Sequence, residues 1–289
     1  MKLKLAQRLL IGYYKNKLKA IAIVSPRKAA EAAFAIFCTP FDNKPPKQSP
    51  PVFHKAEKLS FEINGITIRG FRWTTEKTGA KKILIVHGFR SYAYKFEKYA
   101  LALKKEGFEI LAFDAPAHGT SDGKKINAYI YKSMLDRIES LYGPFYGVMG
   151  HSLGGLAASL TFESLADRES RKLVLIAPAE TERALKNFFM VIPVDEKVKK
   201  AFTELINEFT GKPISYYSVG RVVKGLSSPV LWVHDKNDNI CPFEDVKPLL
   251  SLSLPHVKFM ITDELGHNKI YKDNKVCAEI VRYFAKGIS

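Results

Sequence analysis

The chain has 289 residues, enough for one large α/β domain or two small ones, and its hydrophobic content of 46% is ordinary for a globular protein. The net charge of +16 is unusual, but no nucleic-acid-binding motif accompanies it, so we expect no nucleic-acid partner. Three widely spaced cysteines argue against a disulfide framework or a structural metal site, and they favour a cytoplasmic protein.

Residues 1–40 are predicted to form a basic helical arm. Lysines alternate with leucines and tyrosines over residues 2–24, as in an amphipathic helix, and Ser25-Pro26 begins a second helix that ends by Thr39-Pro40. The lysines interrupt any signal-peptide or membrane-spanning pattern. We expect the arm to dock on the rest of the chain, or on a second copy in a homodimer. The alternative is peripheral contact with an anionic membrane surface.

Residues 41–56 are rich in proline and are predicted to be an extended linker before a domain at 57–289. That domain opens with a β-hairpin, because apolar residues alternate on both sides of Asn64-Gly65, a type I′ turn sequence. Apolar strands then alternate with helical segments, which predicts a mostly parallel sheet covered by helices. We expect these strands at 83–86, 109–113, 145–149, 172–176, 230–233 and 257–261. Residues 180–227 break the alternation and predict a helical insertion.

The stretch Gly150-His-Ser-Leu-Gly154 follows a predicted strand and precedes a helix of small residues. This is the Gly-x-Ser-x-Gly pattern of a nucleophile elbow, in which a sharp turn presents the serine hydroxyl above the sheet. Ser152 is therefore the predicted nucleophile. Because a serine hydroxyl is a weak nucleophile, it needs a base that is itself held by a carboxylate.

The partners of Ser152 are expected in loops at the carboxyl ends of later strands, where the active groups of parallel sheets gather. The loop after 230–233 carries Asp235 and Asp238, and the loop after 257–261 carries His267. We favour Asp238 as the acid, because Asp235 adjoins the strand end and can hold the turn there. His267 is the predicted base. The chain order Ser, Asp, His is one of the known orders of such triads.

Two backbone N–H groups are expected to form an oxyanion hole: that of Leu153, directly after the nucleophile, and that of Phe89, in the loop after strand 83–86. His118 is predicted either to shape its own loop or to face a substrate. The other candidates for contact with a substrate are His151, Phe188 and Phe189. No cofactor is expected, and no metal, because no histidines and carboxylates stand at ligand spacing.

Five motifs together resemble the α/β-hydrolase superfamily, most of all the small serine esterases of its serine-aminopeptidase-like branch. They are His87-Gly88-Phe89, Asp114–Ser121, Gly150–Gly154, Asp238–Pro242 and Gly266-His267. The resemblance covers residues 57–286 and implies an eight-stranded, mostly parallel sheet flanked by helices, with a small helical cap after the sixth strand. Two positions depart from the usual family pattern: Asp235 replaces a glycine, and Ala117 precedes His118.

The resemblance also implies an activity: hydrolysis of a small carboxylic ester or other acyl substrate through an acyl-enzyme, without a cofactor. The same residues would serve an acyltransferase or a thioesterase. A protein of another class, one that binds membranes or partners on a non-catalytic hydrolase scaffold, is the further alternative.

Overall fold

The computed structural model describes residues 5–41, 45 and 48–286. The chain divides into two compact units, each built from two segments: unit 1 is Met1–Thr39 with Thr181–Ser218, and unit 2 is Pro40–Glu180 with Val219–Ser289. The structure groups the predicted arm with the insertion, because the two share one core, whereas the sequence predicted the insertion as part of the domain at 57–289. Residues 2–4 of the predicted arm helix and residues 42–44 and 46–47 of the predicted linker lie outside the described residues.

Unit 2 contains an eight-stranded sheet with the strand order β1-β2-β4-β3-β5-β6-β7-β8. Strands β3 to β8 are parallel to one another, whereas β1 and β2 run antiparallel to their neighbours, so the predicted mostly parallel sheet is confirmed. The strands are β1 Glu57–Ile63, β2 Ile66–Trp73, β3 Lys82–Val86, β4 Glu109–Phe113, β5 Gly147–His151, β6 Lys172–Ile176, β7 Val230–Asp235 and β8 Val257–Thr262.

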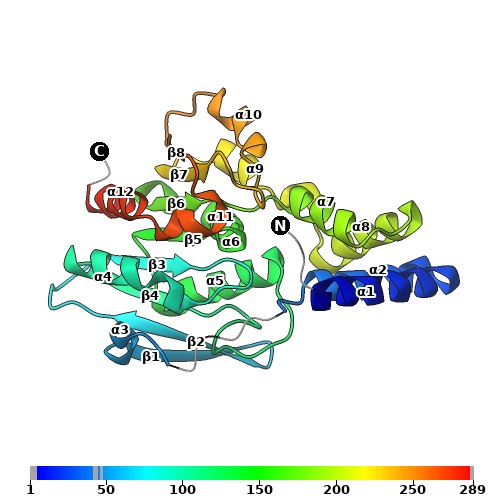
Figure 1. Ribbon diagram of the computed structural model, residues 1–289. Coiled ribbons are helices and arrows are strands. Elements are labelled where there is room, and N and C mark those ends of the chain that lie inside the picture. Colours follow the sequence, from blue (N-terminus) through cyan, green and yellow to red (C-terminus); the bar gives the residue numbers. More distant parts are fainter. Residues whose placement is uncertain (1–4, 42–44, 46–47, 287–289) are drawn as a thin grey trace. The chain divides into compact units, whose positions relative to one another are not determined.

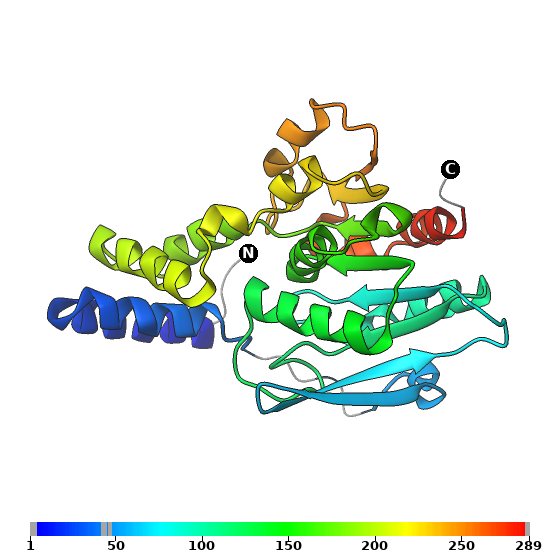
Figure 2. The same cartoon turned by 180° about the vertical axis from the view of Figure 1, so that it is seen from behind.

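Helices cover both faces of this sheet, as Figures 1 and 2 show from opposite sides. Helices α4 (Glu97–Lys105) and α12 (Asn274–Ala285) lie on one face, and α5 (Ala128–Tyr142) and α6 (Leu153–Glu163) lie on the other. Covering on both faces explains why every residue of β6 is buried. The shorter helices of this unit are α3 Pro51–His54, α9 Val219–Lys224, α10 Lys247–Leu250 and α11 Gly266–Lys269.

At the start of unit 2, the predicted hairpin turn is present, but part of the predicted linker is a packed helix. Asn64 and Gly65 have φ values of 49° and 73°, as a type I′ turn requires. The linker prediction is wrong over α3, because the Phe53 side chain is 2% exposed and packs edge to face against Phe71 and Trp73. The Trp73 indole N–H also donates to the Val52 carbonyl at 3.0 Å. One buried aromatic ring therefore fixes a segment whose prolines suggested an extended chain.

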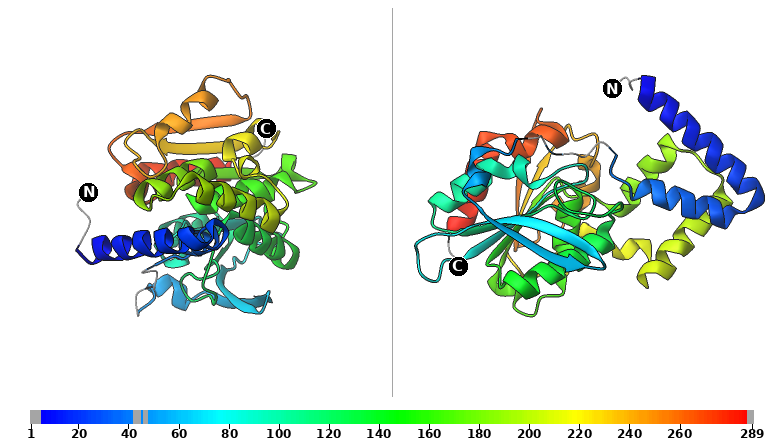
Figure 3. Two further views of the ribbon diagram at one scale, coloured as in Figure 1. Left: turned by 90° about the vertical axis from the view of Figure 1, so that its right-hand side faces the viewer. Right: turned by 90° about the horizontal axis from the view of Figure 1, so that it is seen from below.

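Unit 1 combines α1 (Leu5–Val24) and α2 (Pro26–Phe37) with α7 (Thr181–Val191) and α8 (Glu196–Thr210), which are blue and yellow-green in Figure 3. Three alanines of α2 are fully buried, so the absence of larger side chains lets α8 pack closely against this helix: Ala29, Ala30 and Ala33. The Phe34 and Phe202 rings meet edge to face at 5.6 Å. The arm is thus docked on the insertion. No described helix is long and apolar enough to cross a membrane.

Candidate active site

Ser152 occupies the single-residue turn between β5, which ends at His151, and α6, which begins at Leu153. Its φ of 54° and ψ of −124° lie in a region that residues other than glycine rarely adopt. The Ser152 N–H donates to the Ile176 carbonyl of the adjacent strand at 3.1 Å, which helps to hold the strained turn. The predicted elbow is present, with its serine 8% exposed.

The glycines beside Ser152 are required by close backbone contacts. A Cβ at Gly150 would lie 2.6 Å from the Gly154 carbonyl oxygen. A Cβ at Gly154 would lie 2.6 Å from the Val86 carbonyl oxygen, and it would also collide with the His87 carbonyl. Neither contact can be relieved by turning a side chain, so α6 can approach β3 and β5 only with glycine at both positions.

Gly154→Ala is expected to destabilise the protein by about 1–3 kcal/mol, because the new methyl group meets backbone atoms. The measurement is urea unfolding of the full chain. Gly225→Ala is the matched control, since its Cβ would lie 3.6 Å from the Val222 carbonyl, an ordinary contact. We expect the control to stay within about 0.5 kcal/mol of the wild type. Equal stability of both variants would contradict the packing argument.

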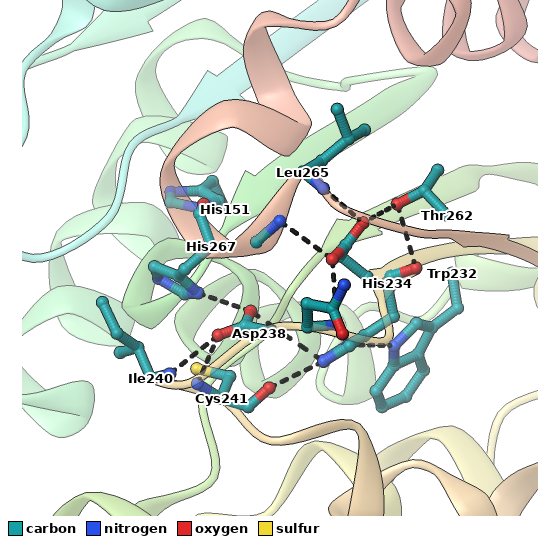
Figure 4. Close-up of polar contacts among 12 residues, drawn as sticks. His151, Trp232, His234, Asp238, Ile240, Cys241, Thr262, Leu265 and His267 are labelled. Atoms are coloured by element: carbon teal, nitrogen blue, oxygen red, sulfur yellow. Dashed lines mark hydrogen bonds and ion pairs between the residues drawn. The ribbon is translucent and has the colours of Figure 1, made fainter.

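Asp238 and His267 lie in direct contact, as the dashed lines in Figure 4 show. The His267 Nδ1–H donates to Asp238 Oδ2 at 2.7 Å, and both side chains are buried. The other carboxylate oxygen, Oδ1, accepts the N–H groups of Ile240 and Cys241 at 2.8 Å each. These bonds fix the carboxylate and leave His267 Nε2 available to accept a proton.

Asp235 ties together the ends of β7 and β8. Its carboxylate accepts hydrogen bonds from the Thr262 hydroxyl at 2.7 Å and from the N–H groups of Gly266, Leu265 and Asn237 at 2.8–3.1 Å. Burial alone would raise the pKa of Asp235, but these hydrogen bonds outweigh it, and the pKa is lowered. Three of these four donors lie in the segments that carry Asp238 and His267, and the fourth, Thr262, is the last residue of β8. Asp235 therefore holds the turn, which is the role that the sequence suggested as its alternative.

Cys241 is a neighbour of Ser152, the predicted nucleophile, and it was not among the site residues expected from the sequence. Burial raises the pKa of its thiol, the Asp238 charge raises it further, and a hydrogen bond with Ser152 opposes the rise. Within the described part of the chain, no hydrogen bond joins the Ser152 hydroxyl to His267, and Ser152 lies close enough to Cys241 to affect the pKa of its thiol. The only signal in the sequence was the position of Cys241, three residues after Asp238.

Methylthiolation of Cys241 with methyl methanethiosulfonate is expected to inactivate the protein at least about tenfold, because the added group would occupy the space around Ser152 Oγ. The reaction should be slow, since burial keeps this thiol protonated. Cys241→Ser should be resistant and Cys277→Ala should stay sensitive, both measured by residual ester hydrolysis. A fully modified Cys241 with unchanged activity would contradict the contact.

The loop after β3 reaches the elbow from the other side. A Cβ at Gly88 would lie 3.0 Å from Ser152 Cβ and 2.9 Å from His151 Nδ1, so glycine is needed for this approach. Phe89 follows Gly88 in the loop, and Leu153 is the first residue of α6, where N–H groups have no partner within the helix. Both predicted oxyanion donors therefore come from segments that border Ser152.

Two buried histidines shape this loop. The Ala115 N–H donates to His87 Nε2 at 2.9 Å, and the Arg90 N–H donates to His118 Nε2 at 3.0 Å. The His87 Nδ1–H donates to the Gly88 carbonyl, and the His118 Nδ1–H donates to the Pro116 carbonyl. Every ring nitrogen is thus used by the backbone, which requires neutral rings. These contacts agree with the predicted loop-shaping role of His118, and its contact with a substrate stays a prediction.

The other candidates for substrate contact are differently placed. His151 is 4% exposed, and its Nε2–H donates to the His267 carbonyl at 3.1 Å, so it supports the predicted base; its contact with a substrate stays a prediction. Phe188 and Phe189 belong to α7 in unit 1, where both pack around Phe202. Their contact with a substrate stays a prediction.

Among the described residues, one group of three or more side chains could approach a metal ion: Asp238, Cys241 and His267, with one ligand atom each within 4.8 Å of the others. Both Asp238 oxygens already accept protein hydrogen bonds, one of them from His267 Nδ1. A metal ion at this place would have to replace those bonds. The contacts thus fit a proton-transfer pair better than a metal site.

Comparisons with known proteins identify a matching family model and similar folds. The model of the Hydrolase_4 family, described as serine aminopeptidase S33, matches residues 78–213. A serine hydrolase-like protein of Dictyostelium discoideum is 31% identical over 129 residues, which are 43% of this chain and 36% of that protein. The matched part is thus about a third of that relative's length.

Two longer matches cover most of the chain. A monoacylglycerol lipase of Mycolicibacterium smegmatis is 20% identical over 247 residues, which are 72% of this chain and 85% of the lipase. The solved structure of a Pyrococcus furiosus esterase is similar with a TM-score of 0.60 and 19% identity, covering 86% of this chain and 98% of the esterase. At this identity, the structural similarity concerns the fold.

Proposed function

This chain belongs to the α/β-hydrolase superfamily, and from that premise we propose that it is a serine hydrolase that cleaves carboxylic esters. The observation that carries the proposal is the 2.7 Å hydrogen bond from His267 to Asp238, beside a serine on a strained turn. A histidine oriented in this way leaves its second nitrogen free to take the serine proton. The lipase and esterase among the similar proteins support an ester as the substrate class.

In the proposed mechanism, the Ser152 hydroxyl forms a hydrogen bond to His267 Nε2 when a substrate binds, since catalytic hydrogen bonds often form only in the complex. Ser152 Oγ bonds to the ester carbonyl carbon while His267 takes its proton. The Phe89 and Leu153 N–H groups stabilise the oxyanion, and the carbon–oxygen bond to the alcohol then breaks. His267 protonates the leaving alcohol and next activates a water molecule that releases the acid.

The test is labelling of the full chain with a fluorophosphonate probe, followed by mapping of the labelled peptide. We expect one adduct, on Ser152, and turnover of p-nitrophenyl esters with a preference for one acyl chain length. A folded protein that is not labelled, or that is labelled elsewhere, would overturn the proposal. In that case a non-catalytic binding protein on the same scaffold would become the leading interpretation.

The acceptor of the acyl group is tested separately, because a thioesterase or an acyltransferase would use the same residues. Acyl thioesters in place of esters, and added alcohol in place of water, distinguish these activities by their products. The proposed assignment is supported if oxygen esters are hydrolysed faster than thioesters are and faster than the acyl group is transferred to added alcohol.

A further inference from the structure

Helix α1 has two different faces. On one side, Leu18 is fully buried in the core of unit 1, and Tyr14, Ile21 and Ala22 pack around that core. On the opposite side, five large apolar side chains are exposed by 57–83% of their surface: Leu5, Leu9, Tyr13, Ile23 and Val24. At 100° per residue these five fall within about 100° of arc, so they form one stripe along the helix.

Positive charges border this apolar stripe on both edges. On the helical wheel Lys17 lies at one edge, and Arg8, Lys15 and Lys19 lie at the other. All four are exposed, and none forms an ion pair with the part of the chain that the structure describes. No acidic residue precedes Glu31 in the chain. The exposed side of α1 is therefore mainly apolar in the middle, where Asn16 is the one polar side chain between Tyr13 and Ile23, and its described charged residues are all cationic.

We propose that this face of α1 binds an anionic lipid surface, with the stripe inserted among the acyl chains and the four cations at the phosphates. A helix lying in a membrane interface needs such a face, because its apolar residues leave water while the long basic side chains reach the headgroups. The proposal goes beyond the hydrolase activity and does not depend on it. It also reconciles the two predictions for the arm, since one face of α1 is docked and the other is available.

Charge decides between a lipid surface and a second copy of the chain. In a two-fold dimer formed through this face, the Lys and Arg edges of the two helices would lie close together without any acidic partner on α1. An anionic lipid surface supplies the opposite charge along the whole helix. Complementarity therefore favours the lipid.

The experiment is co-sedimentation of the full chain with vesicles of phosphatidylcholine alone and with vesicles containing about one-third phosphatidylglycerol. The stripe variant carries Leu5→Gln, Leu9→Gln and Tyr13→Gln. The matched control carries Leu101→Gln, Leu141→Gln and Leu252→Gln, three leucines of unit 2 that are 41–50% exposed. Circular dichroism and thermal unfolding check that both variants are folded.

We expect wild type and control to bind the anionic vesicles, and the stripe variant to lose binding at least about tenfold. Binding of the wild type should weaken with added salt, as screening requires. Wild type that stays in the supernatant, or a stripe variant that binds equally well, overturns the proposal. A dimer in solution that the stripe variant loses, with no vesicle binding, assigns the face to a second copy and overturns it as well.

Discussion

Replacing Ser152 with alanine is expected to lower kcat for ester hydrolysis by at least about 10⁴-fold while the protein stays folded. The substitution removes the atom that would form the acyl-enzyme, but it leaves the backbone of the elbow in place. His267→Ala should cost about as much, because a serine without a base is nearly inert. The double variant should be no slower than either single variant, since the two residues act as one unit. Steady-state kinetics on the best p-nitrophenyl ester measures all three.

Ser159→Ala is the matched control for this series. Ser159 lies on the same helix α6, is fully buried, and its hydroxyl donates to the Leu156 carbonyl at 2.8 Å. It should retain activity within about tenfold of the wild type, because its hydroxyl serves only the helix. Additive losses in the Ser152 and His267 double variant, or an active Ser152→Ala protein, would rule out the proposed mechanism.

Local chemistry accounts for the features that the sequence predicted well. The Asn64-Gly65 turn needs positive φ at both residues, and the Ser25 hydroxyl accepts the Lys28 N–H at 3.2 Å at the start of α2. The elbow and the Asp238–His267 contact were also predictable, because a strand end fixes where a loop begins. The turn and the helix start are determined within a few positions, whereas the Asp238–His267 contact joins loops 29 residues apart at the ends of the neighbouring strands β7 and β8.

Long-range packing accounts for what the sequence could not predict. The segments that build unit 1 are separated by about 140 residues in the chain, and their shared core depends on how two amphipathic faces fit together. The three buried alanines of α2 were visible in the sequence, but nothing in it identified α8 as their partner. The buried position of Phe53 has the same origin: its neighbours Phe71 and Trp73 belong to β2.

The directions of the side chains around Ser152 could not be predicted from the sequence either. Cys241 follows Asp238 by three residues, and only the path of the turn brings its sulfur to the nucleophile. His118 and His151 were placed near the site from their positions in the chain. Which atoms their nitrogens contact depends on the loops after two other strands, β3 and β8, so these contacts became visible only in the structure.

The free energy of unfolding is expected to fall steeply as the pH drops from 6.5 to 4. Burial lowers the pKa of His87 from 6.5 to about 4 and that of His118 to about 3, the latter also through the nearby His87. Between pH 6.5 and 4 the unfolded chain binds a proton at each of these two histidines, and the folded chain does not. Each histidine therefore lowers the free energy of unfolding by about 1.4 kcal/mol per pH unit, and the pair lowers it by about 3 kcal/mol per pH unit.

Urea unfolding at several pH values between 8 and 5 measures this slope, in a range above the ordinary titration of carboxylates. His118→Asn lowers stability at pH 8 because the Arg90 N–H loses its acceptor, but it should reduce the slope below pH 6.5 by about 1.4 kcal/mol per pH unit. Protonation of either ring would also place a hydrogen on Nε2, against the N–H group that it now accepts. The loop that carries the predicted oxyanion donor Phe89 is thus held by rings that must stay neutral, and a stability independent of pH in this range would contradict that arrangement.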